Sequence, residues 1–169
     1  MFDFILQDVR QDEVETKAGV GSVLTLRTLA VVLFRLSQAI GRHSPVLAGV
    51  LKQVNQLLTG ADVAWQASIG PRLSLYHPAA VVIGPYCVIG ARCKIQSSVT
   101  IGGGNGMQGG KDDSPTIGDD VAIGPGARIL GPVSIGRRVL IGANAVVTRD
   151  VPEGSFARGV PARSEPLSR

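Results

Sequence analysis

Histidine and cysteine, two residue types that often perform catalysis, are scarce in this chain. The 169 residues include two histidines, His43 and His77, and two cysteines, Cys87 and Cys93. A neutral imidazole accepts a proton near pH 7, so a histidine is a natural general base for activating a hydroxyl group. His77 is a candidate for this role, with a capping or surface histidine as the alternative. His43 lies in the segment GRHSP, residues 41–45, a predicted break between two helices, and is expected at the surface.

His77 lies within a repeated region of the sequence. After Gly60 the isoleucines recur with a six-residue period, which indicates a repeat architecture. Seven of their nine spacings are six residues, and the other two are 14 and 16. The ten isoleucines are Ile69, Ile83, Ile89, Ile95, Ile101, Ile117, Ile123, Ile129, Ile135 and Ile141.

Each hexad reads as a short strand followed by a corner. A small or β-branched residue stands two positions before most of these isoleucines, so both side chains face the same side of a strand. The glycine that usually follows permits a turn. A straight helix would spread a six-residue period around its surface, so a mainly β solenoid with stacked coils is predicted. Cys87 and Cys93 occupy the inward small position and are interpreted as packing residues, and two cysteines are too few for a zinc site.

The two irregular spacings mark where residues must bulge from the solenoid. The first contains His77 within residues 75–80, and the second contains the segment GGGNGMQGGKDDSP, for which a protruding loop over 103–116 is predicted. Loops on a rigid scaffold are where functional residues concentrate. Both breaks are therefore candidate sites.

The residues before Gly60 have a different period. Apolar residues recur at three- and four-residue spacing over residues 29–40 and 47–58, which predicts two amphipathic helices, with a weaker helix before Gly19. The predicted organisation is a helical segment over 1–60, a β-helix domain over 61–154 and a C-terminal tail over 155–169.

Composition excludes several classes of protein. Charged residues are 18% and hydrophobic residues 44%, which excludes a disordered chain. Aromatic residues are 4% and the net charge of +4 is not concentrated in a block, so nucleic acid is not an expected partner. The acidic N-terminus lacks the features of a secretory signal and the apolar runs are too short to span a bilayer, so a cytoplasmic protein without a membrane span is expected.

Several motifs together resemble serine acetyltransferases and their hexapeptide-repeat relatives. They are Asp62, IGPRLSLYHPAAVVIG, QSSVTIGGG, SPTIGDDVAIGPGARILG, IGANAVV and GVPAR, which together cover about residues 60–163. The resemblance implies a left-handed parallel β-helix, a homotrimer, and acetyl-CoA bound in a groove between neighbouring subunits. An acetyl-CoA-dependent O-acetyltransferase is therefore expected.

The resemblance also assigns roles to residues. His77 matches the catalytic base, and Asp62 matches the aspartate that orients the imidazole and stabilises its protonated form. Backbone N–H groups near Gly102 and Gly103 would stabilise the tetrahedral oxyanion. The family positions that line the coenzyme groove are Gly103, Pro125 and Ala143, and Arg163 in the tail would meet a coenzyme phosphate.

The chain departs from the family where the acceptor binds. The second active-site histidine is replaced by Ser114, the arginine before it by Asp113, and the aspartate before the catalytic histidine by Tyr76. Because these changes remove groups for a serine carboxylate and ammonium, the expected acceptor is a hydroxyl of another small molecule or of a sugar or polysaccharide precursor.

Three alternatives accompany this expectation. One is a serine O-acetyltransferase of cysteine biosynthesis, in which Ser114, Asp113 or Asp112 takes over acceptor binding. A second is a non-enzymatic β-helix scaffold. A third, a gamma-class carbonic anhydrase, would need three histidine ligands, whereas the chain has two histidines. No metal is expected.

Overall fold

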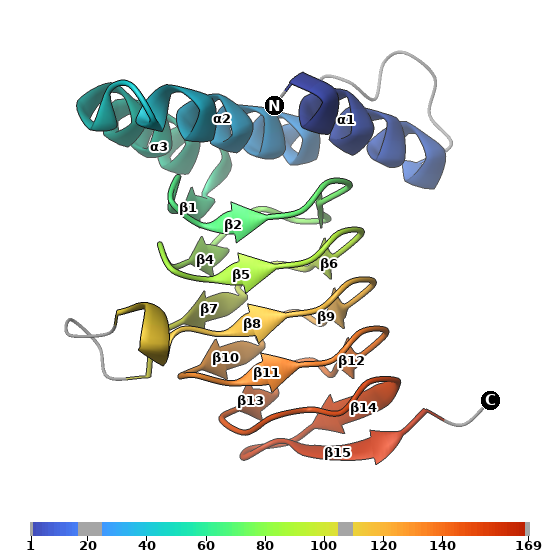
Figure 1. The fold of residues 1–169 in the computed structure, drawn as a ribbon. Coiled ribbons are helices and arrows are strands. Elements are labelled where there is room, and N and C mark those ends of the chain that lie inside the picture. Colours follow the sequence, from blue (N-terminus) through green and yellow to red (C-terminus); the bar gives the residue numbers. More distant parts are fainter. Residues whose placement is uncertain (1, 17–24, 105–109, 168–169) are drawn as a thin grey trace.

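The computed structural model describes residues 2–16, 25–104 and 110–167, in which three helices lie on one end of a column of stacked β coils (Figure 1). The helices are α1 (Phe2–Thr16), α2 (Leu26–Gly41) and α3 (Pro45–Thr59). Helices α2 and α3 match the two predicted amphipathic segments. None of the helices within the described ranges is long and apolar enough to cross a bilayer.

Local signals fix the bounds of α2 and α3. The Thr25 hydroxyl accepts a hydrogen bond from Thr28 N at 3.3 Å, and Ser44 performs the same capping role for α3. Pro45 opens α3, where its missing N–H costs nothing. Gly60 ends the helix at φ 78°, in the left-handed region that glycine adopts without steric cost.

The chain after α3 forms short strands. They are β1 (Asp62–Val63), β2 (Ser68–Ile69), β3 (Ser74–Leu75), β4 (Val82–Ile83), β5 (Val88–Ile89), β6 (Lys94–Ile95), β7 (Thr100–Gly102), β8 (Thr116–Ile117), β9 (Ala122–Ile123), β10 (Arg128–Leu130), β11 (Ser134–Ile135), β12 (Leu140–Ile141), β13 (Val146–Val147), β14 (Ser155–Arg158) and β15 (Arg163–Pro166). A short 3₁₀ helix, Lys111–Asp113, lies outside the column of strands shortly before β8 (Figure 1), and residues 105–109 of the loop predicted over 103–116 lie outside the described residues.

Strands three apart in the sequence pair with one another, as β1 does with β4, so the strands form three parallel sheets. Sheet I contains β1, β4, β7, β10 and β13; sheet II contains β2, β5, β8 and β11; sheet III contains β3, β6, β9, β12 and β14, with β15 added antiparallel to β14. This is the predicted left-handed parallel β-helix. Each of the first four coils contributes one strand to each face, and the last coil pairs with sheet II only through the bridge between Val151 and Ile135.

The core is made of ladders of aliphatic side chains that stack along the column. In sheet I, Ile101 pairs with Ile83 on one side and with Ile129 on the other. Equivalent ladders run through sheets II and III. All members of these ladders are buried. Each hexad therefore buries its isoleucine only because a neighbouring coil covers it.

The helices close the first coil of the column. Phe34, Ala30 and Val31 on α2 belong to the same hydrophobic core as the β-helix. The Arg35 side chain, at 0% exposure, donates to Ile69 O at 2.7 Å and to Gly70 O at 2.6 Å. These bonds satisfy carbonyl groups that would otherwise be left open at the end of the stack.

Candidate active-site grooves

His77 lies at the corner where sheet III passes into sheet I. Strand β3 leads into it, and Tyr76 N donates to Ile95 O at 2.9 Å, which fixes the chain just before the histidine. The corner closes with Val81 N donating to Pro78 O at 3.1 Å. His77 is exposed. Its imidazole is therefore open to a ligand, as a general base requires.

Asp62 lies beside this corner, as the first residue of β1. Its N–H donates to Val81 O at 2.8 Å, four residues after His77. The Asp62 carboxylate forms an ion pair with Lys52 of α3. Across the described ranges, no hydrogen bond or ion pair involves the His77 side chain. The structure thus brings Asp62 to the same corner without joining it to His77, and its orienting role stays a prediction.

The corners of successive coils stack on one another below His77. Three backbone hydrogen bonds, all of 2.9 Å, connect them: Ser98 N to Ala79 O, Gly126 N to Ser97 O, and Asn144 N to Pro125 O. Pro125 and Ala143 therefore lie on the same edge of the prism as His77, in later coils. We call this edge the His77 corner.

A groove of about 380 Å³ runs beside the His77 corner. Tyr76 lines it at one end and Phe156 at the other, with Pro125 between them. Its lining comes from five successive coils, so four spacings of about 4.8 Å give it a length of about 19 Å. Lys94 and Gln96 make the Tyr76 end polar, whereas Leu140 and Phe156 make the other end apolar. We call it the corner groove; its length suits an extended ligand with chemically different ends.

Four other predicted residues, Gly102, Gly103, Asp113 and Ser114, lie at the opposite end of the sheet I strands, at the end of β7 or between β7 and β8. Gly102 is the last residue of β7. Gly103 packs against Asp113, because a Cβ built on this glycine would lie 3.0 Å from Asp113 Oδ2. The Ser114 hydroxyl donates to Gly110 O at 3.0 Å. We call this edge the loop corner.

A second groove, of about 400 Å³, lies at the loop corner. Ser114 and Lys111 line it, together with the half-exposed Tyr86. The predicted site residues of a single chain are therefore divided between two corners. The predicted base and two of the predicted coenzyme positions are at one corner, and the predicted oxyanion donors and two of the predicted acceptor positions are at the other.

Arg163 lies apart from both grooves. It belongs to β15, where all four residues are exposed. The nearby Arg158 instead approaches the corner groove, since its Cζ is 5.4 Å from the centroid of the Phe156 ring. Arg158 also forms an ion pair of 2.8 Å with Glu165. The predicted phosphate contact of Arg163 stays a prediction.

Sequence reasoning missed three residues near the predicted site: Arg27, Lys94 and Phe156. The Arg27 Cζ lies 4.3 Å from the centroid of the Tyr76 ring. Lys94 stands just before an inward isoleucine, so the hexad pattern could have assigned it to the outer face of sheet III. The contact of Arg27 with Tyr76 could not be predicted from the sequence, because it depends on how α2 packs on the first coil.

The two cysteines are buried within the core. Burial raises the pKa of both thiols, Cys87 and Cys93, to about 11. Both are therefore protonated at neutral pH and unsuited to nucleophilic chemistry. Within the described ranges, no three His, Cys, Asp or Glu side chains gather into a metal-binding group.

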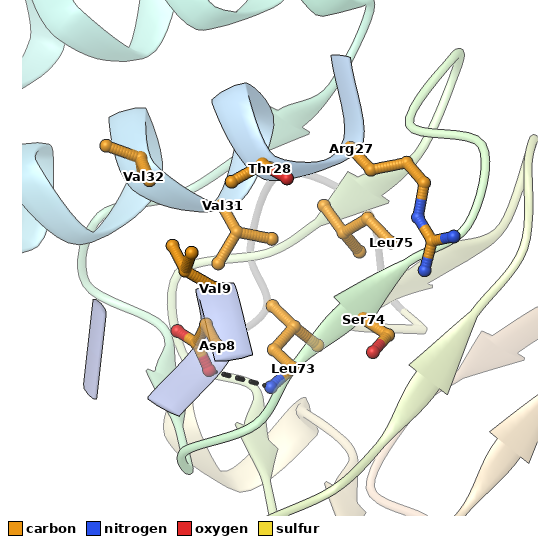
Figure 2. Close-up of a pocket in the computed structure, with 9 residues that line it drawn as sticks. All are labelled: Asp8, Val9, Arg27, Thr28, Val31, Val32, Leu73, Ser74 and Leu75. Atoms are coloured by element: carbon orange, nitrogen blue, oxygen red, sulfur yellow. Dashed lines mark hydrogen bonds between the residues drawn. The ribbon is translucent and has the colours of Figure 1, made fainter. Parts of the chain in front are cut away.

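A small cavity lies between α1, α2 and β3 (Figure 2). Asp8 closes one side of it, with Oδ1 accepting from Leu73 N at 2.9 Å, and the Ser74 hydroxyl oxygen is buried without a hydrogen-bond partner among the described residues. The cavity has a volume of about 10 Å³, which is room for about one water molecule. It is too small for a substrate. The Arg27 side chain extends past Leu75, away from Asp8 (Figure 2).

Known proteins resemble both the repeat and the whole chain. Residues 114–149 match the family model described as bacterial transferase hexapeptide (six repeats). The serine acetyltransferase of Helicobacter pylori is 38% identical over 136 residues, covering 80% of this chain and 78% of the relative. That of Mycobacterium tuberculosis is 43% identical over 122 residues, covering 72% of this chain but 52% of the relative.

Solved structures extend the likeness to the helices. The structure of soybean serine acetyltransferase complexed with serine superposes with a TM-score of 0.88 at 34% identity, covering 96% of this chain and 68% of that chain. The present chain spans about half the length of several of the curated relatives that it matches.

Proposed function

Because the chain belongs to the serine acetyltransferase family, we propose that it transfers the acetyl group of acetyl-CoA to the hydroxyl group of serine. The observation that carries the proposal is that His77 is exposed and directly follows Tyr76, which lines the polar end of the corner groove. A base at this position would be close to both a small hydroxylated acceptor and the reactive end of an extended coenzyme.

The expectation of a sugar or another non-serine acceptor is wrong. Relatives of this chain that cover most of its length are serine acetyltransferases, and they favour the alternative. The expectation rested on Tyr76, Asp113 and Ser114, which stand where the family has other residues. A substitution in the acceptor site shows which contact to the acceptor is lost, but residues elsewhere in the fold can provide a different contact.

The reaction would be a direct acyl transfer. His77 accepts the proton of the serine hydroxyl as its oxygen attacks the thioester carbonyl carbon. The tetrahedral intermediate then collapses, the C–S bond breaks, and the departing thiolate takes the proton from the His77 imidazolium. Asp62 would stabilise that imidazolium once its carboxylate turns from Lys52 toward the ring. The N–H groups of Gly102 and Gly103 would stabilise the oxyanion.

Oxyanion stabilisation by these glycines requires a second copy of the chain. In one copy, Gly102 and Gly103 lie at the loop corner, across sheet I from His77. We infer a homotrimer in which the loop corner of one copy faces the His77 corner of its neighbour. Closed threefold symmetry would then create three equivalent sites.

The corner groove would hold the coenzyme, with its thioester at the polar Tyr76 end and its adenosine moiety toward Phe156. Pro125 and Ala143 present little side-chain bulk to the pantetheine arm along the same edge. Arg163 would lie beyond Phe156, near the phosphates. A cytoplasmic location, where acetyl-CoA is available, stays a prediction.

The test is release of CoA thiol from acetyl-CoA with serine, homoserine and a panel of sugars as acceptors. Thiol release with serine well above that with the sugars is expected. Thermal unfolding with CoA separates an enzyme from a scaffold, since ligand at 100 times its Kd stabilises a protein by about 2.7 kcal/mol. A chain that neither gains stability from CoA nor releases thiol with serine would be a scaffold.

A further inference from the structure

One residue per coil forms the edge of the corner groove, immediately after the inward-facing residue of each sheet III strand. The backbone stays in register to the last coil, where Gly142 N donates to Ala157 O at 2.8 Å. Four coil spacings of about 4.8 Å separate Arg158 from Tyr76. Arg158 therefore lies at the end of the groove away from the proposed base. In successive coils the edge residues are Tyr76, Gln96, Gly124, Gly142 and Arg158, and the first three line the groove.

The Arg158 side chain is packed against the apolar end of the groove. Ala157 is fully buried, so Phe156 and Arg158 on either side of it both project outward from β14. The Arg158 Cζ lies 5.4 Å from the centroid of the Phe156 ring, and Phe156 lines the groove. Gly142 provides the space, since a Cβ built on it would lie 3.2 Å from Arg158 Cβ and 3.4 Å from Phe156 Cε2. The exposed arginine thus places a cation beside the apolar end of the groove.

A second arginine lies directly opposite Arg158. Strands β14 and β15 are antiparallel neighbours at the end of the column away from the helices (Figure 1), and Arg163 is the register partner of Arg158. Directly opposite side chains project from the same face, and like charges in such a pair destabilise a sheet. Glu165 forms a 2.8 Å ion pair with the Arg158 Nη2 atom, so two arginines and one glutamate leave a net charge of +1. An anion bound between the arginines would relieve their repulsion.

The coenzyme proposed for this groove requires a cation at its adenosine end. The adenosine, which we place at Phe156, bears a 3′-phosphate on the ribose next to the adenine. A phosphate group carries about two negative charges at neutral pH and accepts paired hydrogen bonds from a guanidinium. A guanidinium has five N–H donors, so Arg158 can bind a second anion while its Nη2 atom holds Glu165. Among the described residues that line the groove, Lys94 is the one cation, and it belongs to β6, toward the Tyr76 end.

We propose that Arg158, together with Arg163, binds the 3′-phosphate of the coenzyme and thereby selects CoA over forms that lack this phosphate. The inference rests on the proposed function, which places the coenzyme in the corner groove. It adds Arg158 to the residues expected to contact a phosphate, and it accounts for two arginines that face each other at the end of β14.

The experiment measures the Kd of CoA and of dephospho-CoA, which lacks only the 3′-phosphate, by isothermal titration calorimetry. The wild-type protein is expected to bind CoA at least about tenfold more tightly, the scale of a hydrogen bond between charged groups. Arg158→Gln should weaken CoA binding about 10- to 100-fold and leave the Kd of dephospho-CoA unchanged, so that most of the preference is lost. The control is Arg137→Gln, an exposed arginine between β11 and β12 that also pairs with a glutamate, Glu153, at 3.5 Å, and no change is expected.

Arg158→Lys and Arg163→Gln give two further measures. The lysine keeps the charge but loses the planar fork, so the preference should fall several-fold without disappearing. Arg163→Gln should reduce the preference as well, because the phosphate would lie between the two arginines. An equal loss of affinity for both ligands in Arg158→Gln would place the guanidinium at the diphosphate instead and overturn the proposal. A wild-type protein that binds both ligands equally would also overturn it.

Failure of the proposed function gives a different result, since neither ligand carries an acetyl group and no acceptor is present. A protein that prefers CoA through Arg158 but releases no thiol from acetyl-CoA with serine would overturn the proposed function and support this inference. A protein that binds neither ligand would overturn both.

Discussion

The Nε atom of Arg35 lies 2.9 Å from the Oδ2 atom of Asp8, and both side chains are buried where α1 and α2 meet the first coil. The other carboxylate oxygen of Asp8 accepts from Leu73 N, four residues before His77. Arg35 in turn donates to Ile69 O and Gly70 O. One buried ion pair thus joins two helices to the strand that leads to the proposed base.

Removal of either partner should destabilise the protein strongly, because the other would remain buried and unpaired. We expect Asp8→Asn or Arg35→Met to lower the free energy of unfolding by about 3–5 kcal/mol, measured by urea denaturation. The matched control is the exposed pair Arg138–Glu153, whose loss should cost at most about 1 kcal/mol. Similar losses at the two pairs would show that the buried pair has no special role.

Replacing His77 should remove general-base catalysis. His77→Ala is expected to lower kcat by about 10²- to 10⁴-fold with the fold retained, measured by thiol release at saturating acetyl-CoA. His43→Ala is the matched control, since His43 is exposed in the turn after α2 and should have no effect. Full activity of His77→Ala would refute the assignment.

Asp62→Asn should act through His77 rather than on binding. The neutral amide cannot stabilise the imidazolium, so kcat should fall about 10²-fold while the KM for serine changes little. A change in KM alone would indicate that Asp62 instead contacts the acceptor.

Phe156 provides a test of the coenzyme position. Phe156→Ala removes the aromatic ring at the apolar end of the corner groove, where we place the adenosine moiety. Base–aromatic stacking contributes about 1–3 kcal/mol, so the KM for acetyl-CoA should rise about 5- to 100-fold. The KM for serine should be unaffected. Equal changes in both KM values would place the coenzyme elsewhere.

The cysteines should react slowly in the folded protein. With a thiol pKa of about 11 for Cys87 and Cys93, the thiolate fraction at pH 8 is about 10⁻³. Alkylation by iodoacetamide should therefore be about 100-fold slower than for a thiol at the ordinary value of 9.0, and should accelerate about tenfold per pH unit up to about pH 11. Unfolding in urea should abolish the difference. Rapid labelling of the native protein at pH 8 would contradict this account.

Much of the fold follows from the hexads. Alternation around each isoleucine assigns inward and outward positions, and the neighbouring coils supply the ladder partners, as for Ile83 and Ile101. The residues that connect the helices to the coils could not be predicted. Asp8 and Leu73 are 65 residues apart, and no local pattern relates them.

The candidate site could be predicted only in part. The interrupted period drew attention to His77, but its predicted role as the base and the coenzyme positions Pro125 and Ala143 came from the family resemblance, and these roles stay predictions. The Arg27–Tyr76 contact depends on how a helix packs against the first coil, which periodicity does not describe. The absence of the family's acceptor-binding residues at positions 76, 113 and 114, taken alone, led to the wrong expectation of a non-serine acceptor.

The antiparallel strand β15 gives the column a defined end. It covers β14, the last parallel strand of sheet III, with exposed polar side chains and Pro166. At the opposite end, α2 and α3 lie over the first coil (Figure 1). A stack of identical coils could in principle grow by adding another molecule to an open edge, as amyloid fibrils do. Blocking both ends makes the protein a particle of fixed length rather than a filament.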